Sequence, residues 1–194
     1  MTDCQNTEKF FSVDDLKEED IELLDPTLRW WMSEQGQVRE EEVRVTKERM
    51  RASIRDAHED VYVVARDRAG GSPAGVMGFG CLDARFFPYR SSIGAKAAGL
   101  LTAFISPDYR GQGLGKVLID EVFHKARTSG CTEVIWSSNP RYRETAWKFY
   151  TVMAGDHIGT IDDFFFPGSL SPVWRKSLRG SNPSQPSPSR EELG

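Results

Sequence analysis

The chain has few of the features that mark an extracellular, metal-binding or membrane protein. Its 194 residues include three cysteines, Cys4, Cys81 and Cys131, which are too few and too scattered for a disulfide framework or a zinc cluster. No apolar run approaches the roughly 18 to 20 residues that span a bilayer. The first residues also lack the basic start and apolar core of a secretory signal. We therefore expect reduced thiols, a cytoplasmic location, no membrane partner and no metal.

A basic excess is also missing, which argues against a nucleic-acid partner. The chain has 25 Lys and Arg residues against 29 Asp and Glu, a formal net charge of −4, whereas nucleic-acid-binding domains usually carry surplus positive charge. Residues 1–60 hold 9 basic and 17 acidic side chains, and residues 61–194 hold 16 and 12. Either the acidic part forms solvated amphipathic helices, or it faces a cationic partner while the basic part holds an anion.

Hydrophobic periodicity predicts one domain at residues 11–178. Residues 1–10 lack an apolar period and should fray, and the Pro- and Ser-rich residues 179–194 should form a disordered tail. A first helix, capped by Ser12 or Asp14, should end at Asp25-Pro26, because the residue before proline avoids the α region. Further helices are expected at 39–57, 113–128 and 140–153, and strands at 61–66, 76–83, 100–105, 132–137, 157–165 and 172–178.

A glycine-rich turn, Ser106 to Lys116, lies between a predicted strand and a predicted helix. The start of a helix leaves backbone N–H groups unpaired and carries the positive end of the helix dipole. Glycines there remove the Cβ atoms that would hold an anion away from those groups. The turn contains Gly111, Gly113 and Gly115, with Arg110 and Lys116 adding positive charge. It is therefore predicted to bind phosphate.

Two common phosphate-binding loops do not fit this turn. The P-loop requires Gly-x-x-x-x-Gly-Lys-Ser/Thr, but Arg110 stands at the first glycine position and neither Ser nor Thr follows Lys116. The dinucleotide-binding fingerprint requires Gly-x-Gly-x-x-Gly, but its third glycine falls on Lys116 in one register and on Leu118 in the other. What remains is Arg-x-x-Gly-x-Gly, formed by Arg110, Gly113 and Gly115.

This pattern resembles the acyl-CoA pyrophosphate loop of the GNAT superfamily of N-acetyltransferases. As in that family, a strand ending in the residues Ile105-Ser106-Pro107-Asp108-Tyr109 precedes the loop. Asn139 followed by residues 146–150 looks like the family's Asn-x-x-Ala-x-x-Leu-Tyr helix with about four extra residues. The resemblance covers roughly residues 61–178. It implies an α+β fold with a mixed, mostly antiparallel central sheet of six to seven strands flanked by helices.

The resemblance also implies acetyl-CoA as cosubstrate. In relatives the strand before the loop splays away from the next strand, and the pantetheine arm pairs with the main chain exposed in the gap. Asn139 should lie near the cofactor, although the insert leaves open whether Arg143 takes that place. The residues expected to bind the cofactor are Ala103, Phe104, Ile105, Arg110, Gly111, Gln112, Gly113, Leu114, Gly115, Lys116 and Asn139.

The chemistry that the family implies is direct attack of an amine on the thioester. This reaction needs a neutral amine, a stabilised oxyanion and a proton for the leaving thiolate. Tyr150 matches the family tyrosine that protonates the thiolate, and its alternative role is that of a buried aromatic side chain. Residues 99–106 contain no Asp, Glu or His. Either ordered water removes the amine proton, or the base is Asp83, followed by Asp162 and Asp163.

In this family the first two helices and the last loops set acceptor specificity, and here they carry aromatic and acidic side chains. This composition suits a primary amine of a small cationic molecule, such as an antibiotic, toxin, polyamine or amino-acid derivative. The alternatives are a protein or peptide N-acetyltransferase and a catalytically weak acyl-CoA-binding sensor, as a monomer or a homodimer. The residues expected near the acceptor are Trp30, Trp31, Glu34, Asp162 and Asp163, with Phe86, Tyr89 and residues 164–166 in the same loops.

Overall fold

The computed structural model describes residues 10–56 and 60–179. A seven-stranded sheet with strand order β1-β4-β5-β6-β7-β9-β8 forms its centre. All neighbouring strands are antiparallel except β6 and β7. The strands are β1 (Phe11–Asp15), β4 (Asp60–Asp67), β5 (Pro73–Cys81), β6 (Ala97–Ile105), β7 (Glu133–Ser137), β8 (Gly159–Asp162) and β9 (Leu170–Ser177), and a separate hairpin pairs β2 (Ser33–Glu34) with β3 (Gln37–Val38). The predicted fold class is confirmed.

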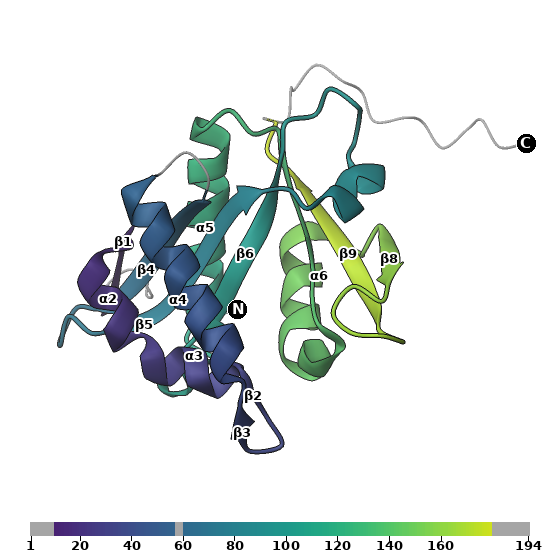
Figure 1. Ribbon diagram of the computed structural model, residues 1–194. Helices are drawn as coiled ribbons and strands as arrows, with labels where there is room; N and C mark the ends of the chain where they lie inside the picture. Colours follow the sequence, from purple (N-terminus) through teal and green to yellow (C-terminus); the bar gives the residue numbers. More distant parts are fainter. Residues whose placement is uncertain (1–9, 57–59, 180–194) are drawn as a thin grey trace, which may run out of the picture.

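Helices cover both faces of the sheet (Figure 1). On β4, Val63 and Ala65 point to the core shared with α5 and α6, whereas Tyr62 and Val64 point to the core under α2, α3 and α4. This alternation follows from the two-residue period of a strand. The helices are α2 (Glu18–Leu23), α3 (Asp25–Trp31), α4 (Glu40–Arg55), α5 (Leu114–Thr128) and α6 (Lys148–Ala154), and η1 (Ala84–Tyr89) is a 3₁₀ segment.

One local prediction for the N-terminal part is wrong. The segment around Ser12 and Asp14 is not a helix cap but the edge strand β1, antiparallel to β4. The segment is a strand because it pairs with a strand that is distant in sequence. Its five residues are too few to show a strand periodicity on their own. The first helix, α2, ends at Leu23, just before Asp25-Pro26 as predicted, and Pro26 lies in the first turn of a further helix, α3, where a proline needs no hydrogen-bond partner. Trp30 and Trp31 therefore belong to α3.

The described core reaches close to both ends of the predicted domain, whose boundaries stay a prediction. The buried residues Phe11 and Leu178 both belong to the core shared with α5. The expected fraying and disorder concern residues that mostly lie outside the described ranges, so they stay predictions. Across residues 10–56 and 60–179, no helix is both long and apolar enough to cross a membrane.

Candidate active site

The central feature of the site is the divergence of two neighbouring strands. β6 pairs with the parallel strand β7 through Ala97–Gly99, and beyond Gly99 the two strands separate (Figure 1). On its other side, the pairing of β6 with β5 shifts register so that Thr102 has no partner on β5. Such a bulge bends its strand. The space between the strands is a cavity of about 510 Å³.

Main-chain groups of β6 face this cavity. The Ser106 N–H donates to the Ala74 carbonyl on β5 at 2.9 Å. Because antiparallel strands present successive residues to opposite neighbours, the main-chain groups of Ile105 and Ala103 point toward the gap. The Trp31 indole N–H donates to the Ile105 carbonyl at 2.8 Å, as this orientation requires. Phe104 instead contributes its ring, which stacks on Trp31 with centroids 5.4 Å apart.

The glycine turn leads from β6 into α5. Gly113 is the N-cap of α5 with φ +83°, and Gly111 has φ +76°. Both values lie in the left-handed region that favours glycine. A Cβ atom at Gly111 would meet no atom within 4 Å, whereas one at Gly115 would lie 3.2 Å from the Ile105 side chain. The turn therefore fits an anion at the helix start, and Gly115 serves close packing against β6.

The side chains around the turn already have partners. The Arg110 guanidinium lies over the rings of Trp30 and Trp31, 4.8 and 4.9 Å from their centroids. Lys116 forms an ion pair with Asp120 one turn along α5. The Gln112 side chain donates to the Asp108 carbonyl at 3.1 Å, and Leu114 is buried in the core. A bound anion would thus compete with Asp120 for Lys116, and it would contact an Arg110 side chain that is packed against the two tryptophans.

The extra residues between Asn139 and Tyr150 break the predicted helix. Asn139 caps a 3₁₀ turn, Pro140–Tyr142, by accepting the Arg141 N–H at 3.0 Å. A single π-helical turn, Arg143–Trp147, then joins this turn to α6. π-turns accommodate inserted residues within a helix. Asn139 lines the cavity, whereas Arg143 lies over the Trp147 ring at 5.4 Å.

Tyr150 lines the same cavity and is 7% exposed. Its ring packs between Trp136 and Trp174, with centroid distances of 5.6 and 5.4 Å. Burial, and secondarily Tyr142, raises the pKa of the Tyr150 phenol well above its usual value. The phenol is therefore protonated at neutral pH, which is the form that can donate a proton.

The three predicted aspartates do not line the cavity, so far as the described residues define it. Asp83 caps η1 and forms an ion pair with Arg85 at 2.6 Å, and this hydrogen bond lowers the pKa of the Asp83 carboxyl. A lowered pKa makes a carboxylate a weaker base. Asp162 is exposed, and Asp163 accepts the Gly168 N–H at 2.6 Å within the loop after β8. The geometry gives none of them a role as base.

Of the side chains expected near the acceptor, Trp31 and Glu34 line the cavity. Trp30 is 45% exposed and lies outside the lining drawn from the described residues, packed against Trp31. Aromatic side chains from η1 and from the loop between β8 and β9 also line it; they are Phe86, Phe164, Phe165 and Phe166.

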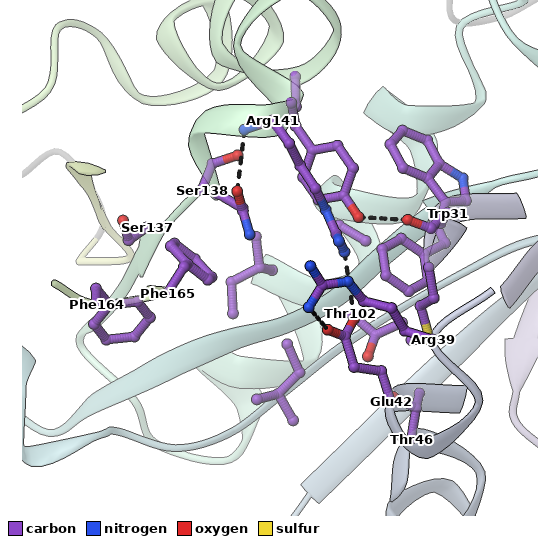
Figure 2. A pocket seen from close by; sticks show the side chains of 18 of the residues that line it. Trp31, Arg39, Glu42, Thr46, Thr102, Ser137, Ser138, Arg141, Phe164 and Phe165 are labelled. Atoms are coloured by element: carbon purple, nitrogen blue, oxygen red, sulfur yellow. Dashed lines mark hydrogen bonds and ion pairs between the residues drawn. The ribbon is translucent and has the colours of Figure 1, made fainter. Parts of the chain in front are cut away.

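Three charged side chains of the cavity are missing from the sequence prediction. Arg39 and Glu42 come from the start of α4, and Arg141 comes from the turn after β7. Figure 2 shows these side chains converging across the cavity. Arg141 contacts Glu42, which precedes it by 99 positions. No local sequence signal could have indicated this meeting.

A family model for the acetyltransferase (GNAT) family matches residues 24–155. A search of curated proteins finds no match. Among solved structures, a protein from Desulfovibrio desulfuricans assigned to the GNAT family has a TM-score of 0.68 at 18% identity, covering 87% of this chain and 99% of that one.

Two other solved structures have the same fold at lower identity. An aminoglycoside 6′-acetyltransferase type Ii has a TM-score of 0.65 at 13% identity, covering 91% of this chain and 99% of that one. A spermidine/spermine N-acetyltransferase from Vibrio cholerae has a TM-score of 0.63 at 13% identity, covering 89% and 95%. Because the family model spans more than half of the sequence, the chain belongs to the GNAT family and is a GNAT-type N-acetyltransferase.

Proposed function

We propose that this protein transfers the acetyl group of acetyl-CoA to a primary amine of a small molecule. The observation that carries this proposal is the cavity between β6 and β7, whose lining includes Ala103 on β6 and the buried Tyr150, whose phenol is protonated. The names of two structural neighbours, an aminoglycoside and a spermidine/spermine acetyltransferase, support amines as acceptors.

The residues present suit acetyl-CoA as cosubstrate. The backbone N–H groups from Gly111 to Gly115 would bind the pyrophosphate, with the Arg110 side chain close by, whereas the Lys116 N–H already donates to the Gly113 carbonyl at 3.0 Å. The outward main-chain groups of Ala103 and Ile105 would pair with the pantetheine arm, which requires the Trp31 indole to share or release the Ile105 carbonyl. The Phe104 ring and Asn139 would shape the sides of this channel.

When bound, acetyl-CoA supplies the thioester that a neutral amine attacks. The Tyr150 phenol would donate its proton to the sulfur as the thiolate leaves. The carboxylates of the described lining, Glu34 and Glu42, are both in ion pairs with arginine. We therefore assign removal of the amine proton to water rather than to Asp83 or another carboxylate.

A thiol-release assay with acetyl-CoA and a panel of amines tests the proposal. The panel should contain free amines, an aminoglycoside, a polyamine and short peptides, and mass spectrometry should detect the acetylated product. Release of CoA with free amines supports the proposal, and transfer to peptides alone would make the protein a peptide acetyltransferase. No turnover with any amine, together with micromolar CoA binding, would instead indicate an acyl-CoA sensor.

A further inference from the structure

The described lining of the cavity contains four charged side chains, which form one cluster. Arg39 forms an ion pair with Glu34, and its Nη1 lies 3.2 Å from Glu42 Oε1. Arg141 Nη2 approaches Glu42 Oε2 at 3.4 Å. Two arginines thus balance two glutamates, so the cavity has no surplus negative charge. A polycation would need carboxylates free of such partners.

Arg141 is the least satisfied member of this cluster. Its side chain is 21% exposed, and its contact with Glu42 is long for a charge-assisted hydrogen bond. Its Nε is buried and lacks a hydrogen-bond partner within the described part of the chain. A guanidinium offers five N–H donors in one plane, and burying a donor without a partner is costly. The guanidinium lies over the Tyr142 ring, 4.7 Å from its centroid, and lines the cavity, so its remaining N–H groups can bind an anionic group there.

The opposite side of the cavity is apolar. Phe164 and Phe165 lie across it from Arg39 and Glu42 (Figure 2). Phe164 is held by the ring of Phe86 at 5.0 Å and by the guanidinium of Arg85 at 3.9 Å. Its position is thus set by both neighbours. An apolar or aromatic group of a ligand could pack against this wall.

We propose that the acceptor is an amino-acid-like amine that carries both a carboxylate and an apolar side chain. Arg141 binds the carboxylate, bidentate contact being the geometry that a guanidinium favours. Residues 164–166 bind the apolar side chain, and Glu42 continues to balance Arg39. In an α-amino acid the amine is two bonds from the carboxyl carbon, so this contact holds the amine inside the cavity. The inference rests on the proposed acetyl transfer and narrows its acceptor.

Three acceptors of matched shape test this proposal in the thiol-release assay: L-phenylalanine, L-phenylalanine amide and phenethylamine. We expect kcat/KM to be highest for L-phenylalanine. Substituting Arg141→Gln should lower kcat/KM for L-phenylalanine by about tenfold to a hundredfold, the range for a hydrogen bond to a charged group. The same substitution should change kcat/KM for phenethylamine by less than about threefold.

Arg44→Gln is the matched control. Like Arg141→Gln, it removes one positive charge. Arg44, however, lies on α4 and pairs with Glu41 and Glu48 on the exposed side of that helix. It should leave the preference for L-phenylalanine intact. If the wild-type protein has the same kcat/KM for phenethylamine and for L-phenylalanine, the proposed carboxylate site is refuted, although the acetyltransferase function stands.

A binding measurement separates the two proposals if no amine turns over. Calorimetry with the CoA-bound protein should detect N-acetyl-L-phenylalanine but not N-acetylphenethylamine, and Arg141→Gln should abolish the difference. Binding without turnover would support the carboxylate site while refuting the acetyl-transfer function. Equal binding of both compounds, or binding of neither, would overturn the carboxylate site.

Discussion

Replacing Tyr150 by Phe tests the proposed acid with little disturbance of the fold. The substitution keeps the ring, which packs between Trp136 and Trp174 at 5.6 and 5.4 Å. It removes the hydroxyl group alone, so no large cavity forms in the core. We expect a change of no more than about 1 kcal/mol in the free energy of unfolding. In a domain of this size that corresponds to a shift in Tm of about 2 to 4 °C.

The effect on catalysis should be much larger. A positioned general acid contributes about a hundredfold to ten-thousandfold to the rate, so kcat should fall by at least about a hundredfold. The Kd for acetyl-CoA should stay within about threefold, because the main chain of β6 and the glycine turn carry the proposed binding. Thiol release measures kcat, and calorimetry measures the Kd in the same preparation.

The pH dependence of the wild-type protein gives a second test. Burial raises the pKa of Tyr150, and an acid works below its pKa, so the phenol remains able to donate across the neutral range. Activity should therefore rise with pH as the acceptor amine loses its proton, and it should not fall near the usual tyrosine value of about 10.

Tyr89→Phe is the control for loss of a tyrosine hydroxyl. Tyr89 OH donates to the Thr160 carbonyl, and the residue is not part of the cavity lining found among the described residues. Its kcat should match that of the wild type. An unchanged kcat in Tyr150→Phe, or an equal loss in both variants, would refute the role of Tyr150 as acid.

Three further substitutions test other parts of the structure. Gly113→Val should abolish CoA binding in calorimetry, because φ +83° at the N-cap of α5 is strained for a β-branched residue and the turn would have to change its backbone; retained affinity would contradict the turn assignment. Trp31→Phe removes the donor to the Ile105 carbonyl and should lower stability in urea by about 1 kcal/mol; an unchanged midpoint would deny this bond a role. Asp20→Ala leaves the largely buried Arg66 without its main partner and should cost about 3 kcal/mol in the same titration; a loss below about 1 kcal/mol would show that water replaces the pair.

Local sequence patterns predicted much of the fold and the glycine turn that leads from β6 into α5. The switch from helical to strand periodicity indicated α4, β4 and β5 nearly in place. The glycine turn was predictable because the left-handed backbone at Gly111 and Gly113 depends on the residues at and next to these positions, which the sequence shows directly. The α+β class followed from the resemblance that this turn carries. The assignment of Tyr150 as acid stays a prediction.

Local sequence patterns could not predict strand β1 or the conformation of the chain that follows β7. β1 exists because Phe11 to Asp15 pair with β4 some fifty positions later. The chain between Asn139 and Tyr150 forms a 3₁₀ turn and a π-turn rather than one helix. Both results depend on packing between segments that are far apart in sequence, which no local period records.

The sequence by itself determined that a glycine turn with left-handed backbone lies between a strand and a helix, because adjacent residues set backbone conformation. The tertiary structure alone decided which charges line the cavity. The acidic surplus of residues 1–60 left a cationic partner open, yet Glu42 meets Arg141, 99 positions later, and the described cavity lining is balanced. Net charge is a sum over residues, whereas a binding site is defined by which charges the fold brings within a few ångströms of one another.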